Sequence, residues 1–429
     1  MRLIKGLVGV ALLTTITACS NNQDKGNVID TSSIATNSSL TGPEKAERLA
    51  KASEQLISFQ GFAYASDVAD LALAIDPSNL RAQFIKVVIG PILTQKGIYA
   101  RVKPLSQVTP EATAEYAKGI ASIQQSYSST LNSFILDGQA DIKTEGDIQD
   151  YLDSVANSFK AIREFAKANK NSELTVMLGD TFYQSMIQRY TESCKVDVEY
   201  VRGYPKYISN CPDMKSFMEV KLNRADFEAI QAEAAGLELY FSLLNSYNLT
   251  GSIETAVAYQ GETPSSSAVL SELLKNKEFA TIRAGNGFKK VKEMGLDAIA
   301  AVTWIMNNQN SLCPMGVSHP RNRLDMLVSN GFCVDKKSKV ESAKDLAIAK
   351  DALSGRVFDN VDMHLRNGIH RTSIKADALL ENPIVDLRSI LPTNYDGCHN
   401  PVAIQDATLN GTFPKADLNY ILASNAQCH

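Results

Sequence analysis

The sequence has few of the residues, and none of the motifs, that most often mark a catalytic or metal centre. It contains one tryptophan and five histidines in 429 residues, and all five histidines lie between residues 319 and 429. The H-E-x-x-H and H-x-x-x-H spacings of zinc sites, the glycine loops that bind phosphate and the G-x-S-x-G turn of serine hydrolases do not occur. The sequence therefore predicts no catalytic residue, no metal ligand and no cofactor.

An excess of positive charge is also missing. The formal net charge is −4, from 43 Lys and Arg residues against 47 Asp and Glu residues, and no basic cluster stands out. Proteins that bind nucleic acid usually present a basic surface to the phosphate backbone, so this composition argues against a nucleic-acid partner. After the N-terminal segment, no apolar run reaches the length of about 20 residues that a transmembrane helix needs.

The N-terminal segment has the three parts of a secretory signal. Arg2 and Lys5 give it a positive start, and an apolar run follows from Gly6 to Leu13. The tetrapeptide Ile16–Cys19 resembles the lipobox of bacterial lipoproteins, in which an aliphatic residue and two small residues precede the cysteine that receives the lipid. The resemblance implies that residues 1–18 are a signal peptide and that Cys19 is the lipidated first residue of the mature protein. An ordinary cleaved signal is the alternative.

The residues after Cys19 bear on where the protein is held. In lipoproteins of enteric-type bacteria, a residue other than Asp at the next position implies transport to the outer membrane, and here that residue is Ser20. Two or three acyl chains would anchor the protein firmly, whereas a single chain binds reversibly. Residues 19–42 are rich in Asn, Ser, Thr and Gly, which is typical of a flexible tether. We therefore expect a lipid-anchored outer-membrane protein that faces the periplasm.

Six cysteines remain once Cys19 is assigned to the lipid. An even number of cysteines in an exported protein favours disulfides, and no C-x-x-C spacing supports the alternative of a zinc site. In the chain-entropy model, a bridge that closes a short loop stabilises the fold by about 3 kcal/mol. Six cysteines allow several connectivities, and their order along the chain favours three local bridges, Cys194–Cys211, Cys313–Cys333 and Cys398–Cys428.

A tetratricopeptide-like pattern follows the tether. Ala65 and Ala72 are small residues seven apart, and the run Ala74–Ala82 contains a proline where the second helix of such a repeat ends. The segment resembles the tetratricopeptide family over about one and a third repeats. It departs from the family at Ser53, where glycine is preferred, and at Ala69, where an aromatic residue is preferred. The resemblance implies paired helices in residues 43–172 and a surface suited to a protein partner.

Apolar residues at steps of three and four predict further helices. The buried stripes lie within residues 116–134, 148–166, 227–244 and 288–305, and residues 341–355 favour one more helix. Thr144, three residues before Asp147, resembles a capping box at the start of the second stripe. Asn223 is a plausible N-cap for the third.

Alternating apolar and polar residues predict short strands. Residues 196–200 and 218–222 favour a β-hairpin with a long loop, which the Cys194–Cys211 bridge would hold, and residues 369–378 favour a further strand. The predicted fold class is mainly α. Tetratricopeptide-like helical hairpins precede a disulfide-stapled helical body with small β elements over residues 173–381, and an irregular, disulfide-held tail follows over residues 382–429.

The start of that tail carries a second resemblance. Residues 381–392 contain the pattern N-P-x-x-D-L-R-x-x-L-P. A similar stretch follows a helical, repeat-containing region in uncharacterised lipoproteins of predatory and social bacteria, and the resemblance implies no particular activity.

Three functional classes remain. The absence of catalytic motifs and the repeat-like helices favour a membrane-anchored scaffold that binds a protein partner. The alternative is a small-ligand binder that works with a transporter, which needs a pocket lined by the stripe helices. A hydrolase would need dispersed histidines or carboxylates to converge in a cleft. The carboxylates considered are Asp325, Asp335, Asp351 and Asp362.

Overall fold

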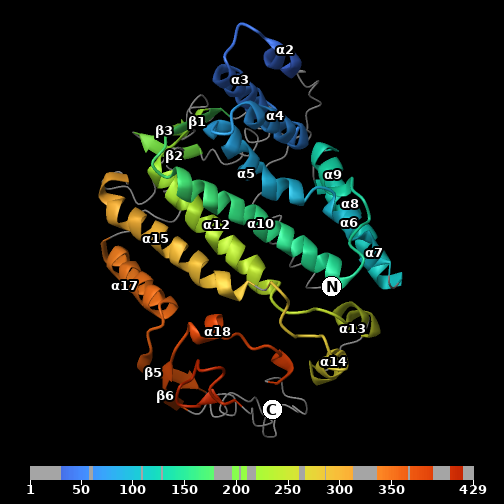
Figure 1. Ribbon diagram of the computed structural model, residues 1–429, viewed down its shortest axis with the longest axis vertical. Helices are drawn as coiled ribbons and strands as arrows, with labels where there is room; N and C mark the ends of the chain where they lie inside the picture. The colour runs from blue at the N-terminus through green and yellow to red at the C-terminus, as the bar shows by residue number, and fades with distance from the viewer. Residues whose placement is uncertain are drawn as a thin grey trace.

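The structure, a computed structural model, is mainly helical, as the sequence predicts (Figure 1). It describes residues 30–57, 61–107, 110–126, 129–177, 196–201, 204–209, 219–259, 266–285, 287–312, 336–365, 368–389 and 406–418. Cys19, the predicted lipidation residue, and all six cysteines of the predicted bridges lie outside these ranges. The signal peptide, the lipid anchor and the disulfides therefore stay predictions.

The N-terminal helices form a stack of short antiparallel neighbours. Local signals start them: Thr41 and Glu44 form a capping box, and the Asn79 side chain accepts a hydrogen bond from the Ala82 backbone N–H at 2.9 Å. Ala65 and Ala72, the small residues seven apart in the tetratricopeptide-like pattern, are fully buried where these helices pack together. The helices are α2 (Thr31–Thr36), α3 (Gly42–Gln55), α4 (Phe62–Ile75) and α5 (Leu80–Thr94).

The next region differs from the sequence prediction. One continuous helix was predicted over residues 116–134, but two helices occupy this region, α8 (Pro110–Ser126) and α9 (Ser129–Leu136). The junction SYSST at residues 126–130 is rich in Ser and Thr, whose side chains compete for backbone hydrogen bonds and favour helix ends. Two single-turn helices precede them, α6 (Ile98–Arg101) and α7 (Lys103–Ser106).

Three long helices form the middle of the molecule, and they confirm the strongest sequence patterns. In α10, the Thr144 hydroxyl accepts a hydrogen bond from the Asp147 backbone N–H at 3.2 Å, and Asn223 caps α12 in a similar way. Helix α12 packs against α10 on one side and α15 on the other, while α5 covers α10 (Figure 1). The three helices are α10 (Glu145–Asn169), α12 (Arg224–Leu244) and α15 (Phe288–Leu312), and a fourth helix, α17 (Lys336–Leu353), packs on α15.

The strands are present but pair differently from the prediction. Residues 196–200 and 218–222 were expected to form one hairpin. Instead, β2 (Val196–Val201) pairs with β3 (Tyr204–Ser209), and β4 (Glu219–Leu222) pairs with β1 (Leu174–Met177). Both pairs are antiparallel. The reason is local: a two-residue connection lets β2 turn back directly, which leaves β4 to a strand at the end of α10.

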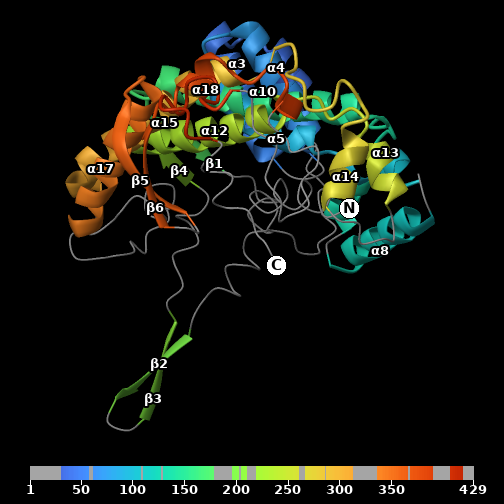
Figure 2. The ribbon, with the colours of Figure 1, turned by 90° about the horizontal axis from the view of Figure 1, so that it is seen from below.

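The C-terminal part adds a third antiparallel pair. Strand β5 (Phe358–Leu365) pairs with β6 (Gly368–Ile374), close to the predicted strand at 369–378. Figure 2 shows the helices arranged as a shallow arch, from which the β2–β3 ribbon projects. The remaining elements are α13 (Ser252–Ala258), α14 (Ser266–Leu273), α18 (Ala378–Glu381) and a 3-10 turn at Leu387–Ser389.

The part of the N-P-x-x-D-L-R-x-x-L-P stretch that the structure describes, residues 381–389, contacts the rest of the fold. Asp386 forms an isolated β-bridge with Thr281, and the Ile282 N–H donates to the Val385 carbonyl at 2.7 Å. Arg388 pairs with the Asp386 carboxylate at 2.5 Å. These contacts fasten the beginning of the tail to the segment between α14 and α15.

Candidate functional site

An apolar cavity of about 360 Å³ lies between the N-terminal helices and the α10–α12 pair. An engineered cavity of about 150 Å³ is enough to bind benzene, so this space suits a larger apolar molecule. It is open on one side and belongs to the size range of small-molecule pockets. Its walls are Glu54, Ile57, Phe62, Phe84, Ile85, Val88, Ile89, Ile92, Phe159, Ile162, Val176, Leu222, Ile230, Glu233, Ala234 and Leu237.

Regular helix periodicity places these walls. Helix α5 supplies one side with residues spaced three and four apart, from Phe84 to Ile92. The opposite side comes from the predicted stripes: Phe159 and Ile162 on α10, and Ile230, Ala234 and Leu237 on α12. From the sequence, these stripes were interpreted as residues that pack in the core. In this region of the structure they line the cavity instead.

The β1–β4 pair closes one end of the cavity. Val176 on β1 and Leu222 on β4 both line it. The antiparallel register places Leu174 opposite Leu222, and Val176 lies two residues after Leu174, so these three side chains share one face of the ribbon. The same face packs on Phe165 and Phe227, which fixes the ribbon to α10 and α12.

Two carboxyl groups break the apolar lining, and they differ in their surroundings. Glu54 is buried at the end of α3, and the Arg81 guanidinium forms an ion pair with its carboxylate. Arg81 also binds Glu47, with its Nε 2.9 Å from the Glu47 Oε1. The charge of Glu54 is therefore compensated from within the protein.

Glu233 has no such compensation. In the part of the chain that the structure describes, its carboxyl group makes neither a hydrogen bond nor an ion pair. Its side chain is exposed because it faces the open cavity, yet the surrounding apolar walls hinder its hydration. This desolvation raises the pKa of Glu233 above its ordinary value of 4.5.

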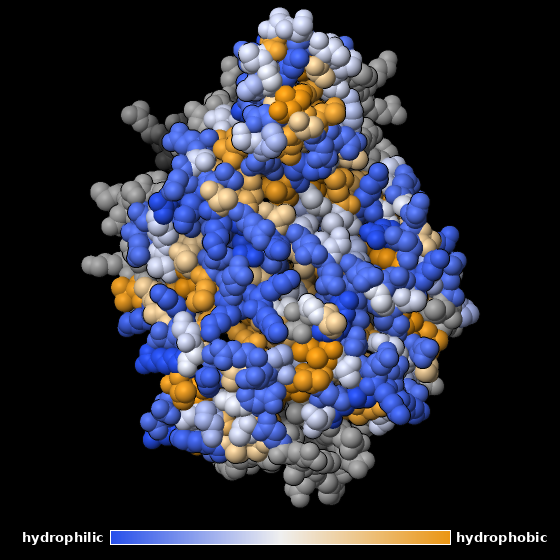
Figure 3. Space-filling view, in the orientation of Figure 1, coloured by the Kyte–Doolittle hydropathy of each residue, from blue (hydrophilic) through white to orange (hydrophobic). Residues whose placement is uncertain are grey.

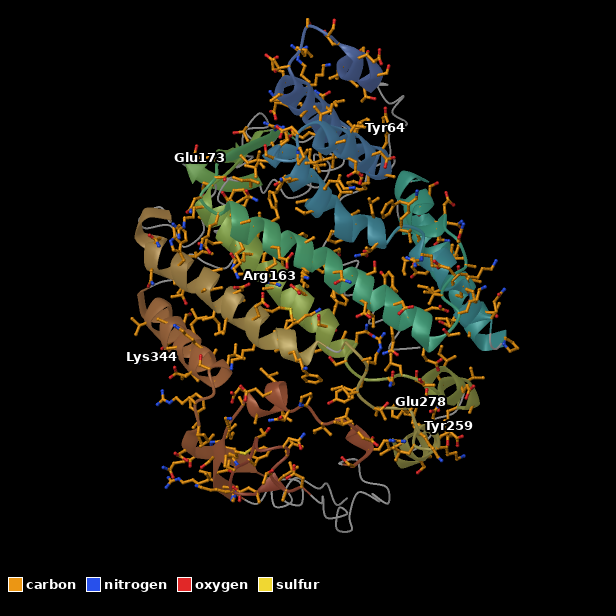
Figure 4. The ribbon with its side chains drawn as sticks, in the orientation of Figure 1. Tyr64, Arg163, Glu173, Tyr259, Glu278 and Lys344 are labelled. Atoms are coloured by element: carbon orange, nitrogen blue, oxygen red, sulfur yellow. The ribbon has the colours of Figure 1, made fainter. Side chains whose placement is uncertain are left out.

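A second polar cluster lies between the long helices, around Arg163 (Figure 4). Its Nε donates to the Glu238 carboxylate at 2.7 Å, and its Nη1 donates to Asp297 at 2.6 Å. Lys167 binds the other oxygen of Asp297 at 2.7 Å. Burial by itself lowers the pKa of Arg163, but the hydrogen bonds and charges of Glu238 and Asp297 outweigh it, and the pKa is raised. Each buried charge has a partner, so the cluster joins α10, α12 and α15.

The dispersed residues considered for catalysis do not converge in the described part of the chain. His364 and His370 occupy adjacent register positions of the β5–β6 pair, so they project from opposite faces. Asp351 pairs with Arg356, and Asp362 pairs with Arg371. Asp325, Asp335, His319, His399 and His429 lie outside the described residues. Where the structure describes the chain, no three His, Cys, Asp or Glu side chains are arranged to hold a metal ion.

Helix α4 presents a row of apolar side chains to solvent. Tyr64, Leu71 and Ile75 are 42%, 48% and 38% exposed, and their spacing of seven and four places them on one side of the helix. Figure 3 shows hydrophobic surface over this end of the molecule, where α3 and α4 lie.

Sequence reasoning identified neither Glu233 nor Arg163 as notable. Both are charged residues within helices, and their only signal was a position beside an apolar stripe.

Among the described helices, none is long and apolar enough to cross a bilayer. A comparison of this chain with protein-family models, curated proteins and solved structures found no match.

Proposed function

We propose that this protein binds a small apolar or amphipathic molecule in the cavity between α5, α10 and α12. The observation that carries the proposal is the cavity itself, which is lined by apolar side chains from four helices and two strands and by two carboxyl groups. Ordinary cores are close-packed, and spaces larger than a water molecule are few. An open apolar space of this size in the middle of the helical body therefore supports ligand binding.

The cellular setting predicted from the sequence fits this proposal. A lipid at Cys19 would hold the protein at a membrane, which is a source of amphipathic molecules. Disulfides at the three cysteine pairs would stiffen the exported chain. Association with a transporter, to which the bound molecule could be delivered, stays a prediction.

The test is binding of diphenylhexatriene, a neutral probe that fluoresces in apolar surroundings, to the full chain. We expect saturable binding of about one probe per chain. Ala234→Trp and Val88→Trp each place an indole ring in the cavity and should weaken binding about tenfold or more. Leu244→Trp is the matched control, because Leu244 lies exposed on α12 outside the lining, and this variant should bind as the wild type does.

Circular dichroism would establish that the variants are folded. If folded Ala234→Trp and Val88→Trp bind the probe with wild-type affinity, the probe occupies another site. The proposal would then be wrong.

A protein-interaction scaffold, favoured by the sequence alone, is the second candidate. The observation that supports it is the exposed row on α4, formed by Tyr64, Leu71 and Ile75. Large side chains of this kind are common anchors in interfaces between proteins. A crosslinked pull-down with the wild type and with Leu71→Asp tests it: a partner lost in the variant would support the scaffold, and a partner retained would contradict this surface.

A further inference from the structure

We propose that the ligand of the cavity is a cationic amphiphile, with an apolar chain among the walls and an ammonium group paired with the Glu233 carboxylate. This inference rests on the proposed function, since it specifies the chemistry of the ligand. The observation behind it is the contrast between the two carboxyl groups of the lining. Glu54 is paired with Arg81, whereas Glu233 has no ion-pair partner in the described chain.

The helix that carries Glu233 offers it no cation. On α12, residues three or four positions away lie on the same side and can contact each other. For Glu233 these positions hold only apolar residues or glycine, namely Ala229, Ile230, Gly236 and Leu237.

The basic residues of the facing helix are already engaged. On α5, Arg81 binds Glu47 and Glu54, and Lys86 binds Asp70 at 2.7 Å. Within the described chain, the cavity therefore has one uncompensated carboxyl group at its wall.

The charge balance of the lining decides among ligand classes. The Glu54–Arg81 pair is neutral as a unit, so the ionised cavity carries the single negative charge of Glu233. An anionic amphiphile would bring a second negative charge into apolar surroundings, which is unfavourable. A neutral amphiphile would bury the carboxylate without a partner. An ammonium group supplies a charge-assisted hydrogen bond and removes that penalty.

The experiment is displacement of diphenylhexatriene by three ligands of equal chain length: dodecylamine, dodecanol and dodecanoate. At about pH 8 the amine is protonated and the fatty acid is ionised in water. We expect dodecylamine to displace the probe at about tenfold lower concentration than dodecanol, and dodecanoate to be the weakest.

Two variants test whether Glu233 causes the preference for dodecylamine over dodecanol. Glu233→Gln keeps the shape of the side chain and removes its charge, so dodecylamine should lose its tenfold advantage over dodecanol. Glu173→Gln is the matched control, because Glu173 is exposed beside β1 and outside the cavity lining (Figure 4). It should keep the wild-type preference.

The outcomes separate the two proposals. Equal displacement by all three ligands, strongest displacement by dodecanoate, or an amine preference that survives in Glu233→Gln would overturn the inference while ligand binding stands. If neither the probe nor any of the ligands binds to the wild type, the proposed function itself is wrong.

Discussion

Replacing Arg163 with Met should destabilise the protein by an amount that reflects a buried charge left without its partner. Arg163 is 3% exposed, and it holds the carboxylates of Glu238 and Asp297, which are 3% and 13% exposed. Methionine is similar in length and fills most of the same space, so loss of packing is small. The variant therefore isolates the electrostatic effect.

The magnitude follows from the geometry of the cluster. Lys167 remains on Asp297 at 2.7 Å after the substitution, whereas Glu238 loses its ion-pair partner. Removing one member of a buried ion pair typically costs about 3–5 kcal/mol. We therefore expect the free energy of unfolding to fall by about 3–5 kcal/mol, because the buried Glu238 carboxylate is left without an ion-pair partner.

Urea titration followed by circular dichroism measures this loss. The double variant Arg163→Met with Glu238→Leu is the matched control, because it removes both charges of the fully buried Arg163–Glu238 pair. It should recover most of the stability, since an apolar replacement of a buried pair is often neutral. A loss below about 1 kcal/mol in the single variant is typical of an exposed pair, and it would refute the buried geometry.

Four further substitutions test local features. Thr144→Ala removes the cap of α10 and should lower the free energy of unfolding by about 1 kcal/mol, measured by urea titration; an unchanged value would contradict the cap. Gly97→Ala should cost about 1–3 kcal/mol, because Gly97 has a φ of +65° and a Cβ there would lie 2.6 Å from the Asp137 carbonyl oxygen. Gly236→Ala, in open space on α12, should instead stabilise by about 0.5–1 kcal/mol, and equal effects of the two alanines would count against this packing. For Glu233, a pKa raised above 4.5 means that the folded state binds more protons than the unfolded state in the window above 4.5, so this residue lowers stability as pH rises through that window. Glu233→Gln should flatten that part of the melting-temperature profile, and identical pH profiles for the two proteins would contradict the raised pKa.

The long helices could be predicted because their signals are local. The stripes of α10 and α12 continue over several turns, and the caps at Thr144 and Asn223 mark their first residues. The break between α8 and α9 was missed, because apolar spacing continues through Tyr127 while the Ser- and Thr-rich junction weakens the helix. Periodicity reports which side of a helix is apolar, not whether the helix is continuous.

Strand pairing depends on information that is not local. Alternation at residues 196–200 and 218–222 correctly indicated strands. The partner of β4 is β1, whose four residues Leu174–Met177 are too few to give a pattern of their own. The predicted hairpin was wrong because β2 pairs with β3, which follows it after two residues, so that β4 pairs with β1 instead.

The cavity could not be predicted, although most of its lining residues could be predicted as apolar and inward-facing. Whether Ala234 and Leu237 pack against other side chains or line a cavity depends on the distance between α12 and α5, and many other contacts determine that distance. Glu233 is equally ambiguous in the sequence, since a single glutamate in a helix is usually solvated. Only the three-dimensional arrangement places this carboxyl group at an apolar wall and away from every cation of the described chain.

Ligand binding in the cavity is the central claim, and native mass spectrometry of the purified full chain tests it most directly. Wild-type protein and the Leu244→Trp control should each carry a non-covalent adduct with the mass of a small amphiphile, released by mild activation. The cavity-filling variants Ala234→Trp and Val88→Trp should lack it. An adduct of equal abundance in folded cavity-filling variants, or a wild-type protein that neither carries an adduct nor takes up added dodecylamine, would contradict the account.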